Sequence, residues 1–101
     1  ESVQWYELEY KRAEGYLLLD VRNEGELKSN GRLKGAVNIP LDSLRDRMAE
    51  LPKDQPIIVS CHSGLRSYAA ERILKQNGYQ AKNLDGAFAL YSTVKPEKVV
   101  K

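Results

Sequence analysis

The chain has 101 residues, of which 42% are hydrophobic and 30% are charged, with a formal net charge of +2, and this predicts one ordinary globular domain. The small, dispersed charge argues against nucleic-acid binding, no apolar run approaches the roughly 20 residues of a membrane helix, and no signal-peptide pattern is present. One cysteine excludes an internal disulfide and fits a reducing compartment, so we expect a cytoplasmic protein.

The beginning of the chain predicts an edge strand, a helix and a buried strand. Residues 2–5 fit the edge strand, and the charged segment 6–13 fits the helix. The apolar run 16–21 predicts the second strand, which closes on Asp20 and Arg22. We expect Asp20 to be a buried carboxylate that hydrogen-bonds loop backbone, and Arg22 to tie neighbouring segments together.

The middle of the chain predicts short elements. Residues 24–29 fit a polar helix that ends at the Asn30-Gly31 turn, and residues 35–39 fit a brief strand stopped by Pro40. A stripe of apolar residues at helical spacing follows, formed by Leu41, Leu44, Met48 and Leu51. The stripe indicates a packing face rather than a cofactor site.

Residues 57–67 join a strand to a helix through a loop that carries the only cysteine of the chain. The β-branched run 57–59 predicts a strand buried on both faces, and Cys61 comes at its carboxyl end. Apolar residues at helical spacing over 67–77 predict the helix, with Ser67 as its cap. We call residues 61–67 the cysteine loop.

The composition of the cysteine loop predicts a reactive thiolate. Backbone N–H groups of a tight loop before a helix form an anion site, which lowers the pKa of a thiol placed in it. Gly64 permits an unusual backbone angle, and Arg66 adds a permanent positive charge. The alternative is that Cys61 is a small core residue. The reactive interpretation is favoured because Cys61 follows the apolar run and precedes polar residues and glycine.

The end of the chain predicts one more strand and a short helix. Residues 80–84 fit the strand, residues 85–91 fit a helix that faces the catalytic crevice, and residues 95–101 form a polar tail with no evident fold. Short strands alternate with helices throughout, which predicts an α/β fold with a largely parallel sheet and helices on both faces. Because the carboxyl ends of parallel strands meet at one crevice, we expect Asp20 near Cys61.

Five motifs in order resemble those of rhodanese-like domains. They are Leu19-Asp20-Val21-Arg22, residues 31–40, Leu51-Pro52-Lys53-Asp54, the cysteine loop Cys61-His62-Ser63-Gly64-Leu65-Arg66-Ser67, and Leu84-Asp85-Gly86-Ala87-Phe88. Ala87 stands where a second glycine is common in that family. The resemblance implies a rhodanese-like fold with a five-stranded sheet. It also implies a single domain over 1–101, with a core at about 3–91 and a tail at 92–101.

The resemblance implies a sulfurtransferase with Cys61 as the catalytic residue. The loop residues His62, Ser63, Gly64, Leu65, Arg66 and Ser67 would bind the substrate and the persulfide, with Asp20 and Arg22 in support. The donor would be thiosulfate or a low-molecular-weight persulfide, and the acceptor a thiol, with no metal required. Arg66 would either stabilise the thiolate and bind anionic donors, or be braced against a carboxylate such as Asp20 or Glu71.

Two other functions remain open. A non-catalytic interaction or regulatory domain is one, although such a domain would be expected to lose the cysteine, and Cys61 is present. A cysteine-dependent phosphatase is the other. Phosphatases of the tyrosine-phosphatase type resemble this loop but place five residues between cysteine and arginine, whereas four separate Cys61 from Arg66. The smaller loop suits a sulfur atom better than a phosphate.

The cysteine loop and the helix after it also resemble rhodanese domains at the C-terminus of coenzyme A disulfide reductases and NADH-dependent persulfide reductases. The resemblance implies a fused flavoprotein domain to which Cys61 relays sulfur. FAD and NAD(P)H would belong to that domain, because this chain has no G-x-G-x-x-G fingerprint. The chain starts at Glu1 without methionine, so we expect it to be part of a longer polypeptide.

Overall fold

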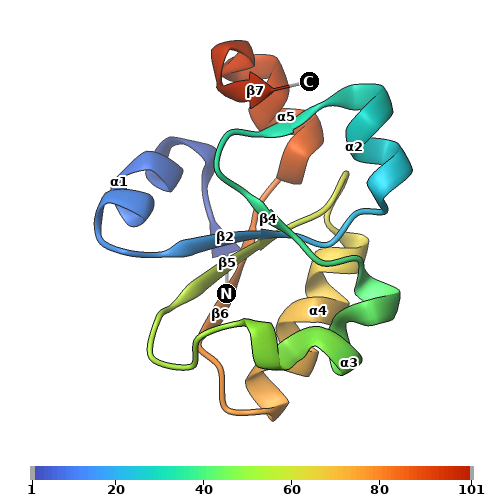
Figure 1. Ribbon diagram of the computed structural model, residues 1–101. Helices are drawn as coiled ribbons and strands as arrows, with labels where there is room; N and C mark the ends of the chain where they lie inside the picture. Colours follow the sequence, from blue (N-terminus) through green and yellow to red (C-terminus); the bar gives the residue numbers. More distant parts are fainter. Residues whose placement is uncertain (1, 101) are drawn as a thin grey trace.

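The computed structural model describes residues 2–100, which form a parallel sheet covered by helices on both faces (Figure 1). In this part of the chain five strands pair in the order β1-β6-β5-β2-β4, and all four pairings are parallel. The strands are β1 (Ser2–Val3), β2 (Leu17–Asp20), β4 (Val37–Asn38), β5 (Ile57–Ser60) and β6 (Ala81–Leu84). The predicted fold class is confirmed.

The central strand β5 separates two hydrophobic cores. Its side chains alternate across the sheet, so Ile57 and Val59 pack into one core while Ile58 packs into the other. The first core is covered by α3 (Leu44–Arg47) and α4 (Leu65–Gln76), and the second by α1 (Leu8–Ala13) and α5 (Ala87–Val94). All three β5 residues are fully buried, which explains the continuous apolar run in the sequence.

The register of the strands sets which residues meet at the carboxyl edge of the sheet. Asp20 is paired with Ser60 of β5 and with Asn38 of β4. Val59 is paired with Asn83 of β6. Cys61 therefore lies one residue beyond the level of Asp20, with polar side chains on the strands around it.

Several predicted elements differ in length or type from the structure. The helix at residues 24–29 is confirmed as α2 (Glu24–Asn30), and it ends at Gly31 with a φ of 81°. The strand at 35–39 is shorter. The apolar stripe lies on three short helical segments. These are the 3-10 helices η2 (Leu41–Ser43) and η3 (Met48–Glu50), with α3 between them. At the other end, η1 (Trp5–Glu7) leads into α1.

Ser67 does not cap α4, because this helix begins two residues earlier than the sequence predicts. Gly64 is the residue before the helix, and its φ of 118° turns the chain so that Leu65 is already helical. Ser67 lies inside the first turn, where its hydroxyl donates to the carbonyl of Gly64 at 3.0 Å. Ser67 is therefore a fully buried residue inside the helix rather than its cap.

The expectation of an unstructured tail is wrong for the residues that the structure describes. After η4 (Pro96–Lys98), strand β7 (Val99–Val100) pairs antiparallel with β3 (Arg32–Leu33). Lys98 also lies 3.5 Å from a carboxylate oxygen of Glu9. A strand of two residues carries no periodic signal in the sequence, so only its distant partner reveals it. Within residues 2–100, no helix has the length and apolar character needed to cross a membrane.

Candidate active site

Cys61 follows β5 directly, and its sulfur lies at the N-terminal end of α4. The residue is 1% exposed. Its Sγ accepts hydrogen bonds from the backbone N–H of Gly64 at 3.0 Å and of Ser67 at 3.4 Å. The hydroxyl oxygen of Ser67 is 3.7 Å from the same sulfur. Three polar groups from two residues of the cysteine loop, Gly64 and Ser67, therefore converge on one sulfur atom.

The surroundings of Cys61 lower the pKa of its thiol. Burial by itself raises this pKa, because it disfavours the charged thiolate. The hydroxyl of Ser67 and the backbone N–H groups of Ser67, Gly64 and Ser63 oppose burial, and together they prevail. The lowered pKa favours the thiolate, which is the nucleophilic form of cysteine.

Gly64 is needed for its backbone angle rather than for space. At a φ of 118° it occupies a region that residues with a side chain rarely adopt. No atom beyond its chain neighbours lies within 4 Å of the position that a Cβ would take. The turn at Gly64 brings its own N–H group onto the sulfur of Cys61. Around it, His62, Ser63 and Leu65 are exposed.

The first turn of α5 holds the other side of the cysteine loop. The N–H of Phe88 donates to the carbonyl of Cys61, and the N–H of Ala89 donates to the carbonyl of His62, each at 2.9 Å. These N–H groups belong to a helix start and have no acceptor within their own helix. The helix predicted at 85–91 is α5 (Ala87–Val94), and it fixes the cysteine loop through its backbone.

Arg66 pairs with Glu26 of α2, a partner that the sequence analysis did not name. Its Nη1 lies 2.5 Å from one carboxylate oxygen of Glu26, and its Nη2 lies 2.8 Å from the other. The predicted alternatives, Asp20 and Glu71, have other partners: Asp20 pairs with Arg22, and Glu71 lies 3.0 Å from Lys75. The positive charge of Arg66 is therefore balanced by a carboxylate from another helix.

Glu26 is held in place from two sides. Arg66 lowers the pKa of its carboxyl to about 2, against the opposing effect of burial, and the N–H of Asn23 contributes in the same direction as Arg66. This N–H donates to Glu26 at 3.0 Å as part of a capping box at the start of α2. Glu26 consequently connects the α2 N-terminus to the cysteine loop.

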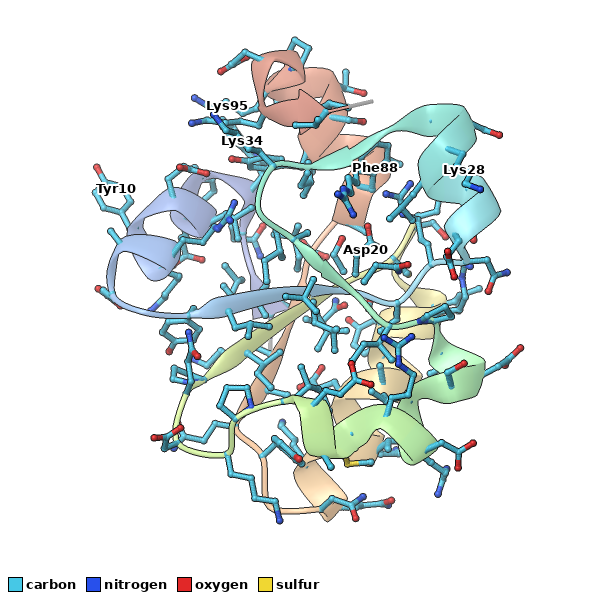
Figure 2. The ribbon with its side chains drawn as sticks, in the orientation of Figure 1. Tyr10, Asp20, Lys28, Lys34, Phe88 and Lys95 are labelled. Atoms are coloured by element: carbon cyan, nitrogen blue, oxygen red, sulfur yellow. The ribbon has the colours of Figure 1, made fainter. Side chains whose placement is uncertain are left out.

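Asp20 and Arg22 form a buried ion pair below α5. The Nη2 of Arg22 is 2.8 Å from the Asp20 carboxylate and also donates to the carbonyl of Gly31, while the N–H of Arg22 donates to Asp20 at 3.0 Å. The guanidinium carbon lies 3.9 Å from the centre of the Phe88 ring, and Figure 2 shows Asp20 below Phe88. These hydrogen bonds join β2 to the α2 end rather than to Cys61.

Two residues near the cysteine loop were not predicted at all, Glu26 and Asn83, and Phe88 was predicted only as part of a motif and not as a contact of Cys61 or Arg22. Asn83 lies on β6, is 1% exposed, and its side-chain oxygen accepts the hydroxyl of Ser67. The available signals were weak: an Asn-x-x-Glu capping pattern for Glu26, and a polar residue inside a buried strand for Asn83. Neither pattern shows which residue Glu26 or Asn83 contacts in the fold.

The fold and the site together define the class of this protein. The sequence profile of the Rhodanese-like domain matches residues 2–93. The chain belongs to the rhodanese-like family.

Individual relatives are similar to this chain over most of its length. A sulfurtransferase of Allochromatium vinosum is 36% identical over 80 residues, covering 78% of this chain and 74% of the relative. The reduced coenzyme A disulfide reductase with a rhodanese domain (CoADR-RHD) of Bacillus anthracis is 48% identical, with a TM-score of 0.93, over 100% of this chain and 18% of that chain. An NAD-dependent persulfide reductase of A. fulgidus is 37% identical, with a TM-score of 0.74, over 90% of this chain and 16% of that chain.

Proposed function

We propose that this domain is a sulfurtransferase that carries sulfane sulfur as a persulfide on Cys61. The observation that carries the proposal is the buried sulfur that accepts the Gly64 N–H at 3.0 Å beneath the start of α4. A sulfur atom held by backbone donors at a helix N-terminus is stabilised as an anion. The 36% identity to a sulfurtransferase supports the same reaction class.

The proposed reaction has two displacement steps. The Cys61 thiolate attacks the outer sulfur of thiosulfate, a new S–S bond forms, and sulfite leaves with the electron pair of the broken S–S bond. An acceptor thiolate then attacks the outer sulfur of the persulfide. The bond from Cys61 to that sulfur breaks, and the Cys61 thiolate returns. A low-molecular-weight persulfide would donate in the same way, with its thiolate as the leaving group.

The cysteine loop offers donors for the sulfur that arrives. Gly64 and Ser67 already donate to Sγ. The first N–H groups of α4 have no acceptor within the helix, so they are available to the outer, negatively charged sulfur of a persulfide. The same preorganised donors would stabilise the charge that develops on sulfur during each displacement.

We further propose that the acceptor is a cysteine of a flavoprotein reductase to which this domain is fused. The similarity to CoADR-RHD and to the persulfide reductase supports this, because the chain covers only 18% and 16% of those polypeptides. The flavin and the nicotinamide cofactor would belong to the fused part. The free thiol fits a reducing compartment such as the cytoplasm.

The decisive experiment is intact-mass analysis of the protein after incubation with thiosulfate or with a low-molecular-weight persulfide. We expect the mass to increase by one sulfur atom, and the increase to disappear on addition of a thiol. Cys61→Ser should show no increase while its circular dichroism spectrum and melting temperature stay close to those of the parent. A parent protein that remains unmodified by every donor would instead favour a non-catalytic interaction domain.

A further inference from the structure

The hydroxyl of Ser67 faces three acceptors with a single proton. Its oxygen is 3.0 Å from the carbonyl of Gly64, 3.7 Å from the sulfur of Cys61, and in hydrogen-bond contact with the side-chain oxygen of Asn83. A serine hydroxyl donates once and accepts twice. The proton of Ser67 therefore reaches the sulfur only when the other two acceptors do not hold it.

Asn83 reaches this hydroxyl from another part of the fold. It belongs to β6, sixteen residues along the chain from Ser67, and it is 1% exposed. A buried side-chain amide is costly unless it is hydrogen-bonded, and Ser67 supplies that bond. The burial of Asn83 in the sheet is thus coupled to a residue that contacts Cys61.

The two protonation states of Cys61 place opposite demands on Ser67. As a thiol, Cys61 donates its S–H to the oxygen of Ser67, and the proton of Ser67 can stay on Asn83. As a thiolate, the sulfur only accepts, and a hydrogen bond to an ion is stronger than one to a neutral group. An amide has one end that accepts and one that donates, so a half-turn of the Asn83 amide lets it serve either state.

We propose that Asn83 is a positioning residue whose amide decides whether the single hydroxyl proton of Ser67 points to Asn83 or to the sulfur of Cys61. With its NH₂ group turned to Ser67, Asn83 donates to the hydroxyl oxygen and directs the proton to the anionic sulfur. The consequence for sulfur transfer rests on the function proposed above, whereas the effect on the thiol does not.

The charged side chains Arg66 and Asp20 near Cys61 are already paired with other residues. Neutral hydrogen-bond donors are therefore left to respond when Cys61 changes between thiol and thiolate. Arg66 on α4 is bound to Glu26 of α2, and Asp20 at the end of β2 is bound to Arg22. His62 in the cysteine loop is exposed. None of these pairs includes Asn83, so substitutions at Asn83 leave them in place.

The test is the pH dependence of Cys61 alkylation by iodoacetamide. Asn83→Ala should raise the thiol pKa by about half a unit to one unit, because Ser67 loses the group that directs its proton. Asn83→Asp, which only accepts and is charged, should raise it further. Asn83→Ser keeps a group that both donates and accepts, and should restore most of the parent pKa.

Two controls separate positioning from simple destabilisation. Asn38 is another side-chain amide at the carboxyl edge of the sheet, and it donates to the carbonyls of Asp20 and Arg22 at 2.9 Å. Asn38→Ala removes this amide and should leave the thiol pKa of Cys61 unchanged. In a Ser67→Ala background, Asn83→Ala should cause no further shift, because the connecting hydroxyl is gone.

Additive shifts in the double variant, or an unchanged thiol pKa in Asn83→Ala, would overturn the proposal. If Asn83→Ala does not fold, the comparison of Asn83→Asp with Asn83→Ser decides, and equal pKa values in these two would reject it. Expected pKa shifts in a protein that accepts no sulfur from any donor would uphold the positioning role and reject the proposed function alone.

Discussion

Arg66 in the first turn of α4 and Glu26 in α2 form a bidentate ion pair, with N···O distances of 2.5 and 2.8 Å. The two side chains are about one-third exposed. The pair lies beside the cysteine loop, and the Cys61 and Asp20 charges both act on Arg66. An arginine in this position would attract anionic donors, but Glu26 offsets its charge.

Removing the carboxylate should expose the charge of Arg66 to reagents that approach Cys61. We expect Glu26→Gln to raise the ratio of alkylation rates for iodoacetate, an anion, over iodoacetamide, its neutral analogue, by about threefold or more. The ratio is measured from loss of free thiol under identical conditions. Glu24→Gln removes a charge from the same helix without touching Arg66 and should change the ratio far less; equal changes in both variants would contradict the role of Glu26.

The same pair should make stability depend on pH in acid. The carboxyl of Glu26 has a pKa of about 2 in the folded protein against an ordinary value of 4.5. A depressed pKa contributes stability that is fully present above about pH 4.5 and is lost as the pH falls toward about 2. The unfolding free energies of the parent and of Glu26→Gln, measured in urea, should differ by a constant amount above pH 4.5 and converge below it. A difference that persists undiminished at the lowest pH would show that the ion pair is not its source.

Ala87 adopts a backbone angle that favours glycine, with a φ of 52°. The helix α5 begins at this residue, and its first turn holds the cysteine loop. Ala87→Gly should relieve the left-handed strain and stabilise the domain by about 0.5–1 kcal/mol after the entropic cost of glycine. Thermal melts should show a rise of a few degrees. Ala89→Gly, inside the same helix, should lower the melting temperature instead. A lower melting temperature in both variants would show that the backbone of Ala87 is not strained.

Val99 anchors the C-terminal strand against the second core. Val99 packs beside Leu33 and its neighbours, whereas Val100 is 43% exposed. Val99→Lys should therefore lower the free energy of unfolding by about 1–2 kcal/mol, while Val100→Lys should have an effect within about 0.5 kcal/mol. Chemical denaturation of the two variants measures the difference. Equal stability of the two would mean that β7 contributes nothing to the core.

The short cysteine loop should discriminate against phosphate. Four residues separate Cys61 from Arg66, and Arg66 is occupied by Glu26. We expect negligible turnover of an aryl phosphate, and inserting one glycine after Ser63 should improve phosphate hydrolysis more than sulfur transfer. Release of the phenol measures hydrolysis, with Cys61→Ser as the blank. Strong dephosphorylation by the unmodified domain would instead place it among the phosphatases.

The sequence by itself determined the parallel α/β fold and the position of the cysteine. Both depend on local patterns. A run of β-branched residues such as Ile57 to Val59 is buried wherever it pairs in a sheet, and Cys61 follows that run directly. Gly64 likewise indicates a turn from its own backbone freedom, which needs no distant partner.

The tertiary structure alone decided which side chains surround the cysteine loop. Glu26 meets Arg66 across 40 residues, and Asn83 meets Ser67 across 16. Strand β7 exists because Leu33 lies opposite Val99. Charge pairs, buried amides and two-residue strands depend on which segments the fold places side by side. The sequence leaves open whether Arg66 serves the thiolate or a carboxylate. Register and helix placement decide that its partner is Glu26 rather than Asp20 or Glu71.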